Sequence, residues 1–456
     1  MANVKSKRDS PWLGYLRACR HAFQAPSVTV LGVLFGIFML LAASTGHSAP
    51  FEPSSSVEES LRQHHRVPPP EQEVWWKATG PDMAWNNKHL AELFPSAPVY
   101  RAGQVRPLQS APDARIGAFL VETPRGKMPF AQFLDSDLST SMGVVVLHQG
   151  RIVFEHYARM KEYEKPIWWS VSKVFASSLI ALLEDRGRVD VSKPVVTYLP
   201  ELAGTDYADI TVRNVLDMAS GVDCSDGTYE RGSCYYEYEA SMNDAVRSQH
   251  TADTPYEFLM HLHVGRWAPQ GQGFDYSGVN TFVLSWIVER VMGMPFQDAV
   301  SKEYWTKLGA EGDASFLAAR NGVALTSGGF MANPRDMARF GLLFTPSWRV
   351  VTDMQVVSDR YIQTILTKGR PELLRHARFP EDPKDLEDIR YNVYQWDRVF
   401  KNNDIYKGGW AGQGLLVNPD RDVVAVYVGY AKDAAFSEVD VLPRLRQVLE
   451  GVYGKH

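Results

Sequence analysis

The stretch Trp168-Trp169-Ser170-Val171-Ser172-Lys173 decides how this chain is interpreted, because it places a serine and a lysine at the start of an apolar helical pattern. Apolar residues at helical spacing predict a helix over Ser170–Asp185. Residues three apart share one face of a helix, so the Ser170 hydroxyl and the Lys173 amine are expected side by side. A serine becomes a good nucleophile when a base takes its proton, and burial can turn a lysine into that base. Alone, the pattern also fits a helix cap with a solvated lysine.

Two later segments carry groups that can complete such a site. Phe274-Asp275-Tyr276-Ser277-Gly278 stands directly before a second apolar helical run, and the Tyr276 phenol can relay a proton from Ser170 to a leaving group. The segment Tyr406–Gly414 holds four glycines in seven residues, which lets another molecule approach the backbone closely. A backbone N–H of this segment, paired with that of Ser170, would form an oxyanion hole. In isolation these segments also fit an ordinary loop tyrosine and a glycine-rich turn.

Strand patterns occur early and late in the chain, with a helical region between them. Met142–His148 and Arg151–Tyr157 flank a tight turn, and Gly414–Asn418 and Val423–Gly429 form a later hairpin. The predicted class is α/β (α+β), with an antiparallel sheet from both chain ends, flanking helices and a helical subdomain. Further predicted helices are Asn280–Val291, Asn333–Phe344 and Glu438–Val452.

The N-terminus has the pattern of an export signal. Basic residues from Lys5 to Arg20 precede an uncharged run, Val28–Ala43, and small residues then extend to Ala49. This order is typical of a signal peptide, although an uncleaved membrane anchor over residues 28–43 also fits. We therefore divide the chain into a signal peptide or anchor (1–49), a Ser- and Pro-rich linker (50–72) and a catalytic domain (73–456). The expected location is the periplasm or the outer face of the inner membrane.

Charge and cysteine content narrow the possible partners. The formal net charge of -5 argues against a nucleic-acid partner. Cys224 and Cys234 lie ten residues apart, where an exported protein can form a disulfide, although two free thiols also fit. We expect no metal, because no nearby histidine completes a zinc ligand set at the usual spacing.

Taken in order, the Ser170-x-x-Lys173 helix, the Tyr276 loop and the Lys407-Gly408-Gly409 strand resemble the serine β-lactamase and penicillin-binding-protein superfamily. The likeness is strongest to its class C-like branch, with the 6-aminohexanoate-dimer hydrolases and the β-lactamase-fold esterases. It extends to Ile210–Gly221 and Thr326–Phe340. The resemblance implies a β-lactamase/transpeptidase-like fold and no metal or organic cofactor.

The resemblance also implies a role for each matching residue. Ser170 would be acylated, with Lys173 as its base and Tyr276 as the family's catalytic tyrosine. Lys407 and Gly409 would contact the substrate, and the backbone N–H groups of Ser170 and Trp410 would bind the oxyanion.

Two departures from the family pattern bear on the substrate. Gly278 stands where β-lactamases usually have an asparagine, and Gly408 stands where the Lys-Thr-Gly box has its threonine. The departure at Gly278 weakens an antibiotic-hydrolysing role, and Gly412-Gln413 is more similar to the amide-hydrolase branch. We therefore expect a serine hydrolase that cleaves an amide or ester bond of a small molecule, most like the 6-aminohexanoate-oligomer hydrolases. The alternatives are a short-chain carboxylesterase, a DD-peptidase or β-lactamase, and a non-enzymatic sensor that is acylated by its ligand.

Overall fold

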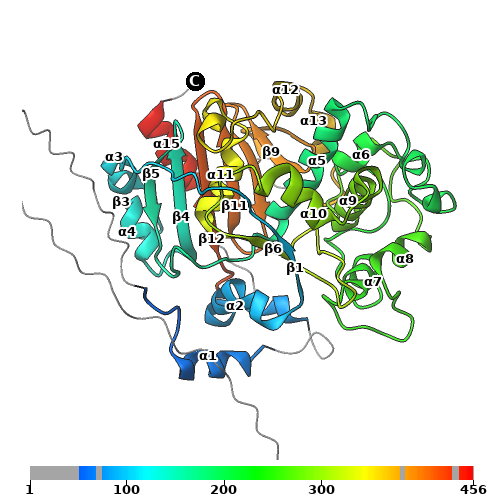
Figure 1. Ribbon diagram of the computed structural model, residues 1–456, viewed down its shortest axis with the longest axis horizontal. Helices are drawn as coiled ribbons and strands as arrows, with labels where there is room; N and C mark the ends of the chain where they lie inside the picture. The colour runs from blue at the N-terminus through cyan, green and yellow to red at the C-terminus, as the bar shows by residue number, and fades with distance from the viewer. Residues whose placement is uncertain (1–50, 68–73, 381–385, 434–440, 455–456) are drawn as a thin grey trace, which may run out of the picture. The chain divides into compact units, whose positions relative to one another are not determined.

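A computed structural model describes residues 51–67, 74–380, 386–433 and 441–454 (Figure 1). The chain from Pro53 onward groups into one unit, distinct from Met1–Glu52. The predicted signal or anchor run over residues 28–43 lies outside the described residues. Among the described residues, none of the helices combines the length and the apolar character that crossing a membrane requires.

The centre of the fold is a seven-stranded antiparallel sheet in the spatial order β5-β4-β12-β11-β10-β9-β8. Strands from the two ends of the chain meet where β4 pairs with β12, with Val144 opposite Tyr427. This pairing confirms the predicted fold class and the prediction that both chain ends build the sheet. The strands of this sheet are β4 (Ser141–His148), β5 (Arg151–His156), β8 (Ile389–Val393), β9 (Trp396–Phe400), β10 (Ile405–Gly409), β11 (Gln413–Asn418) and β12 (Val423–Gly429).

The two strands at one edge, β8 and β9, were not predicted from the sequence. They are short and mix apolar with charged residues, so their pattern is weak. The residues that join them, Tyr394 and Gln395, adopt positive φ values of 48° and 64° without the glycine or asparagine that usually marks such a turn. The smaller strands are β1 (Ser96–Val99), β6 (Ala314–Leu317) and β7 (Phe330–Met331) in one sheet, with β2 (Leu120–Val121) and β3 (Met128–Pro129) in another.

Helices cover both faces of the main sheet, because alternate side chains of its central strands enter two different cores. Val145 and Val424 pack in the core that holds α5 (Lys173–Asp185), α9 (Gly278–Met292) and α11 (Pro334–Leu342). Val144 and Ala425 pack in the core that holds α15 (Val441–Tyr453). A strand buried on both faces needs apolar residues throughout, which explains the continuous apolar runs of β4 and β12.

The predicted helices agree with the structure except at their ends. The first turn of the predicted Ser170–Asp185 helix is a 3₁₀ segment, η2 (Trp169–Ser172), and α5 follows it. The other helices are α2 (Gly80–Leu93), α3 (Ala114–Ala118), α4 (Phe130–Asp135), α6 (Val212–Leu216), α7 (Cys234–Ser241), α8 (Pro255–Met260), α10 (Phe296–Val300), α12 (Asp359–Thr367) and α13 (Pro371–Arg375), with a 3₁₀ turn η1 (Trp75–Lys77).

The predicted linker contains a helix, α1 (Val57–His64). The Ser56 hydroxyl caps this helix by accepting a hydrogen bond from the backbone N–H of Glu59. The helix lies beside α2, where the His64 and Trp85 ring centroids are 4.8 Å apart. A capped helix can form in such a polar segment because α2 offers it a packing partner.

Gly341 lies where α11 comes closest to the sheet, which makes it a test of that packing. A Cβ at position 341 would stand 2.5 Å from Val424 Cγ1. We expect Gly341→Ala to lower the free energy of unfolding by ~1–2 kcal/mol, because overpacking outweighs the ~1 kcal/mol that alanine gains in a helix. Gly204→Ala is the matched control, because no described atom lies within 4 Å of its added Cβ. Denaturant unfolding measures both, and equal stability of the two variants would contradict this packing.

Candidate active site

The backbone around Ser170 is fixed to strand β7. Trp168 donates its backbone N–H to Phe330 O at 2.7 Å and its indole N–H to Ala332 O at 2.9 Å. The Phe330 N–H in turn donates to the Ser172 hydroxyl at 3.0 Å. These bonds hold both sides of Ser170, whose half-buried side chain is left at the wall of a cavity.

The residue before the candidate nucleophile has an unusual backbone conformation. Trp169 has a φ of 45°, a left-handed value that costs a non-glycine residue ~1–3 kcal/mol. Its ring stacks on Trp75 of η1, with ring centroids 5.5 Å apart. The Trp75 indole is fixed in turn by a 2.6 Å hydrogen bond to Asp244. The packing around Trp169 therefore includes a segment that precedes the main sheet by more than sixty residues.

Lys173 lies one turn after Ser170 and is almost fully buried, with 2% of its surface exposed. Its Nζ is 3.0 Å from Ser170 Oγ and donates to Ser327 O at 2.8 Å. Burial lowers the pKa of Lys173 to about 8, and the nearby Lys407 acts in the same direction. The carboxylate of Asp226, 4.0 Å away, opposes both effects. A large fraction of Lys173 is therefore neutral near pH 8.

Tyr276 lies against both lysines. The Lys407 amine donates to the Tyr276 hydroxyl at 2.6 Å, and Lys173 Nζ is 4.9 Å from the centre of the ring. Burial raises the pKa of Tyr276 well above its usual value, so the phenol keeps its proton. An ammonium has no acceptor, so the Tyr276 oxygen accepts from Lys407 and its own hydrogen can be donated elsewhere. The structure thus brings together the three segments that the sequence singled out.

Asp397 of β9 is a site residue that the sequence analysis missed. It accepts hydrogen bonds from the amine of Lys407 and, at 2.9 Å, from the backbone N–H of Gly408. Burial lowers the pKa of Lys407, and the charge of Asp397 opposes that effect. The only sequence signal was an aspartate inside a short segment of mixed apolar and charged residues, Trp396–Phe400.

Gly409 ends β10 directly against the segment that carries Ser170. A Cβ at position 409 would lie 2.6 Å from Trp168 O, so the close approach requires glycine. The next residue, Trp410, lies with Ser170 on the wall of the same cavity. The proposed oxyanion pair, the N–H groups of Ser170 and Trp410, stays a prediction.

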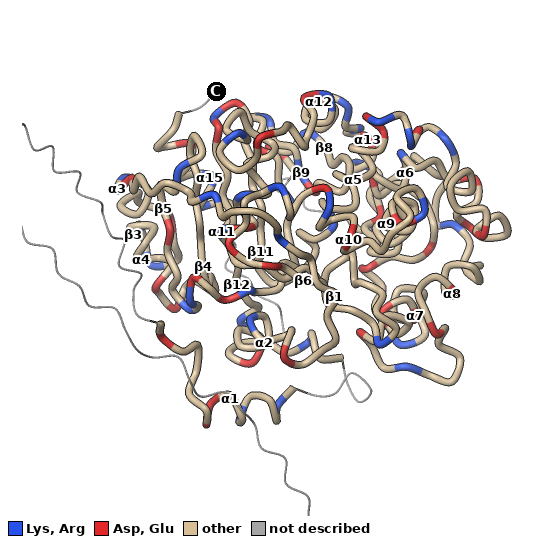
Figure 2. The backbone as a smooth tube through the Cα atoms, viewed as in Figure 1, with Lys and Arg blue, Asp and Glu red and all other residues tan. Residues whose placement is uncertain are grey.

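The cavity in front of Ser170 has a volume of about 700 Å³. Its lining includes residues that the sequence did not single out, among them Trp76 and Lys77 of η1. It also includes two buried acids of the helical subdomain, Glu239 and Asp244. Burial and the neighbouring Asp244 raise the pKa of Glu239, and burial raises that of Asp244 to about 6. Figure 2 shows acidic and basic residues scattered along the rest of the chain.

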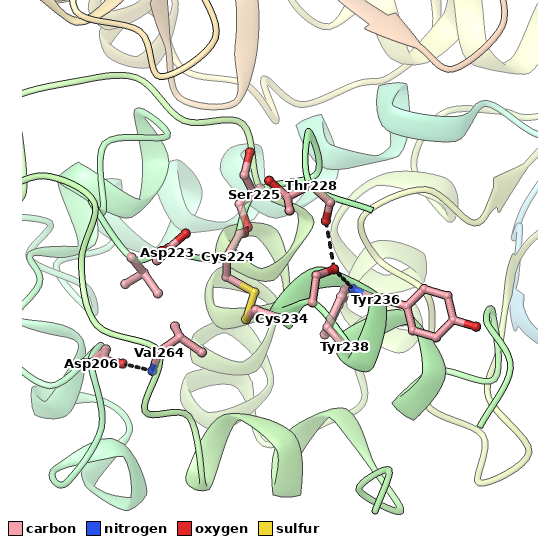
Figure 3. The surroundings of a disulfide bond; sticks show 12 residues. Asp206, Asp223, Cys224, Ser225, Thr228, Cys234, Tyr236, Tyr238 and Val264 are labelled. Carbon is pink, nitrogen blue, oxygen red and sulfur yellow. Dashed lines mark hydrogen bonds between the residues drawn. A yellow bond between two sulfur atoms is a disulfide. The ribbon is translucent and has the colours of Figure 1, made fainter. Parts of the chain in front are cut away.

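Cys224 and Cys234 form a disulfide, the pairing that the sequence left open against free thiols (Figure 3). The bond joins the loop after Gly221 to the first residue of α7. Asp226 and Tyr229, which lie between the two cysteines, line the cavity. The disulfide therefore closes a loop that forms part of the cavity wall.

This fold, with an adjacent serine and lysine at the first turn of a buried helix, defines a serine hydrolase of β-lactamase architecture. Residues 129–449 match the family model described as Beta-lactamase, which is more than half of the chain. The chain belongs to the Beta-lactamase family, as the sequence resemblance implied.

Individual relatives place the chain within this family. A 6-aminohexanoate-dimer hydrolase of Paenarthrobacter ureafaciens is 29% identical over 388 residues, which cover 84% of this chain and 92% of the relative. A solved structure from Bacillus anthracis, named as a candidate 6-aminohexanoate-dimer hydrolase, has a TM-score of 0.68 at 23% identity and covers 82% of this chain and 93% of its own. A solved structure of a penicillin-binding-protein homologue of Caulobacter crescentus has a TM-score of 0.54 at 15% identity. The match covers 76% of this chain and 98% of that homologue. Both structures support the fold.

Asp397→Asn tests the ion pair with Lys407. Removing the carboxylate leaves a fully buried amine without its charge partner, so we expect a loss of ~3–5 kcal/mol in unfolding free energy near pH 7. The pKa of Lys407 in the folded variant falls further below its unfolded value of ~10.4, so the unfolded chain binds more protons. Stability of the variant therefore rises with pH, and the loss shrinks towards pH ~10.

The control for this prediction is the double variant Asp397→Asn/Lys407→Met, which carries no buried amine. Denaturant unfolding at several pH values should show that the double variant loses less unfolding free energy than Asp397→Asn, and that this loss depends little on pH. A loss in Asp397→Asn that is equal at pH 7 and pH 10 would show that Asp397 does not act through the charge of Lys407.

Proposed function

We propose that this protein hydrolyses an amide bond of a small linear molecule through an acyl-enzyme on Ser170, with Lys173 as the base and Tyr276 as the proton relay. The observation that carries this proposal is the 3.0 Å contact between Lys173 Nζ and Ser170 Oγ in a buried setting. A lysine with a pKa of about 8 supplies the neutral amine that a serine nucleophile needs.

The first step is attack of Ser170 Oγ on the substrate carbonyl carbon. Neutral Lys173 keeps its hydrogen bond to Ser327 O and turns its lone pair towards Ser170, from which it takes the proton. A tetrahedral intermediate forms, and its oxyanion is bound by the N–H groups of Ser170 and Trp410. Losing one such donor typically reduces kcat by a factor of about 10²–10³.

The second step expels the amine. Tyr276 donates its proton to the leaving nitrogen as the C–N bond breaks, and the proton held by Lys173 replaces the one that Tyr276 gives up. The Lys407 ammonium stabilises the tyrosine oxygen while that transfer proceeds, over the 2.6 Å hydrogen bond between them. Water then attacks the ester of Ser170, with the same groups acting in reverse.

The cavity supports a substrate with charged ends and an apolar middle. Aromatic side chains contribute much of its lining, and the rings of Trp76 and Tyr229 lie 4.6 Å apart. The buried acids Glu239 and Asp244 can receive an ammonium group, and the exposed amine of Lys77 can pair with a carboxylate. A linear amide of two amino acids with long apolar chains has all three features. Lys407 and Gly409 would contact this substrate beside the scissile bond.

Alternative substrates have weaker support. Gly278 stands where β-lactamases usually have an asparagine, and an added Cβ at this position would make tight contacts of 3.1 Å with Tyr235 Oη and Ser327 Cβ, which weakens the β-lactamase alternative. A short-chain ester needs the same catalytic groups and remains the second candidate. A sensor that is acylated without turnover is the non-enzymatic alternative.

We also propose that the catalytic domain works outside the cytoplasm, in the periplasm or at the outer face of the inner membrane. The Cys224–Cys234 disulfide supports an oxidising compartment. The charge pattern of Lys5–Ala49 supports export.

Ser170→Ala and Lys173→Ala test the catalytic pair. We expect both variants of the full-length protein to lose hydrolysis by a factor of about 10⁴ or more, because the remaining groups cannot replace the nucleophile or its base. Ser178→Ala, on the same helix, is the control and should keep wild-type rates. Mass spectrometry of quenched reactions should place the acyl group on Ser170. Full activity of Ser170→Ala would contradict the mechanism, and a stable adduct without release would favour the sensor.

The substrate class is tested by comparing the linear 6-aminohexanoate dimer with its N-acetylated form, p-nitrophenyl acetate and a chromogenic cephalosporin. We expect the dimer to give the highest kcat/KM. N-acetylation removes the ammonium that Glu239 and Asp244 can bind and should raise KM about tenfold, which corresponds to one charge-assisted contact. A preference for p-nitrophenyl acetate with no measurable cleavage of the dimer would replace the amidase with the esterase.

A further inference from the structure

We propose that Asp226 is a positioning residue of this active site, and that the disulfide-closed loop Cys224–Cys234 holds its carboxylate beside Lys173. The inference rests on the proposed role of Lys173 and adds a residue that controls it.

The loop that carries Asp226 is bonded along its length to the loop that carries Tyr276. The Asp226 N–H donates to Tyr276 O at 2.9 Å, and its Oδ1 accepts from the Gly278 N–H at 2.6 Å. Between Tyr276 and Gly278, the Ser277 hydroxyl donates to the carbonyl oxygen of Cys224, two residues before Asp226, at 2.5 Å. The two loops therefore move as one unit, and the carboxylate of Asp226 cannot turn away from the site without breaking these bonds.

The second cysteine fixes the other side of the same carboxylate. Cys234 begins α7, and the hydroxyl of the next residue, Tyr235, interacts with Asp226 and lies 3.1 Å from the position that a Cβ of residue 278 would take. The disulfide thus links a residue two positions before Asp226 with a residue next to Tyr235 (Figure 3). Both contacts of the carboxylate, the Gly278 N–H and the Tyr235 hydroxyl, depend on the closed loop.

The geometry places the carboxylate near Lys173. Asp226 Oδ2 lies 4.0 Å from Lys173 Nζ, close enough for a strong Coulomb effect but too far for a direct hydrogen bond. A contact ion pair would keep Lys173 charged, and a missing carboxylate would leave a buried amine with little affinity for protons. The intermediate distance lets Lys173 accept a proton from Ser170 and release it again.

Several other groups act on Lys173, so the effect of Asp226 must be separated from theirs. Burial and Lys407 lower the pKa of Lys173, whereas Asp226 is the first of the carboxylates that raise it. The charged and titratable groups that face Lys173 are Asp226 of the disulfide loop, Tyr276, Lys407 of β10, Asp397 of β9 and Glu239 of α7.

The test is the pH dependence of kcat/KM for the full-length Asp226→Asn variant, with p-nitrophenyl acetate as the probe. Asparagine keeps the shape of the side chain and an acceptor for the Gly278 N–H but removes the charge. Wild-type activity should rise as pH increases through about 8, because Lys173 must be neutral to act as a base. In Asp226→Asn the pKa of Lys173 falls, so the rising limb of the pH profile of kcat/KM should move to lower pH by roughly one unit.

Asp223→Asn is the matched control. Asp223 lies three residues before Asp226, directly ahead of the disulfide-closed loop, and its carboxylate is 47% exposed and 2.7 Å from Arg378. Its charge is not among those that face Lys173, so the limb should not move. A role of Asp226 in folding alone would lower the rate at every pH without moving the limb, and that result would overturn the proposal.

A second experiment tests the disulfide with the double variant Cys224→Ala/Cys234→Ala. It keeps the proposal testable if Asp226→Asn does not fold. Opening the loop should lower kcat ten- to a hundredfold while KM for p-nitrophenyl acetate changes little, since small misplacements of catalytic groups have effects of this size. Wild-type kcat in the double variant would overturn the role of the loop. Failure of this inference is distinguishable from failure of the proposed function, because only the latter abolishes labelling of Ser170 in the wild-type protein.

Discussion

The burial of Lys173 beside Ser170 is the constraint on which the rest of this structure depends. A primary amine at 2% exposure loses most of its hydration, and the cost falls on its charged form. The surrounding fold has to exclude water from the amine and still offer Ser327 O as a fixed acceptor at 2.8 Å. The central sheet, the helix α5 and the loop before α11 meet at this amine, and each supplies part of its enclosure.

Strand β10 shows how the sheet brings further groups of the site close to the buried amine of Lys173. Its residue Lys407 reaches Tyr276, its Gly409 lies against the backbone of Trp168, and its end carries Trp410 to the cavity. A larger residue at 409 would separate the strand from the nucleophile segment. Gly409 is therefore needed for this close approach, which agrees with the sequence argument for Tyr406–Gly414.

The sequence predicted the parts of the fold that have strong local patterns. The apolar runs of β4 and β12, the helix after Ser170 and the helix before Gly293 follow periodicities that their own residues carry. The edge strands β8 and β9 do not, because half of their residues are polar and their turn uses Tyr394 and Gln395 at positive φ. The triplet of Ser170, Lys173 and Tyr276 had sequence motifs that could be recognised, whereas Asp397 had none, because its partner Lys407 is ten residues away and becomes a neighbour only when β9 pairs with β10.

The roles of Lys77 and Glu239 in the cavity wall were missed for a similar reason. Lys77 comes from a turn near the start of the domain, and Glu239 from a helix of the middle region, so only the tertiary fold brings them to one cavity. The α1 helix also illustrates the limit of composition, because a polar segment that would not fold alone finds a partner in α2. Composition describes what a segment can do by itself, and tertiary contacts can change that outcome.

The two buried lysines of the site argue for a division of labour that follows from where their carboxylates lie. Lys407 contacts Asp397 directly through a hydrogen bond, an arrangement that favours its charged form and suits a group that stabilises the Tyr276 oxygen. Lys173 has its nearest carboxylate, that of Asp226, at 4.0 Å, and its pKa of about 8 suits a group that takes and returns a proton. The same side chain is thus suited to the role of a fixed cation at one position and to that of a base at the other. The difference comes from the two loops and strands that carry Asp226 and Asp397, which is why residues outside the recognisable triplet determine what the triplet can do.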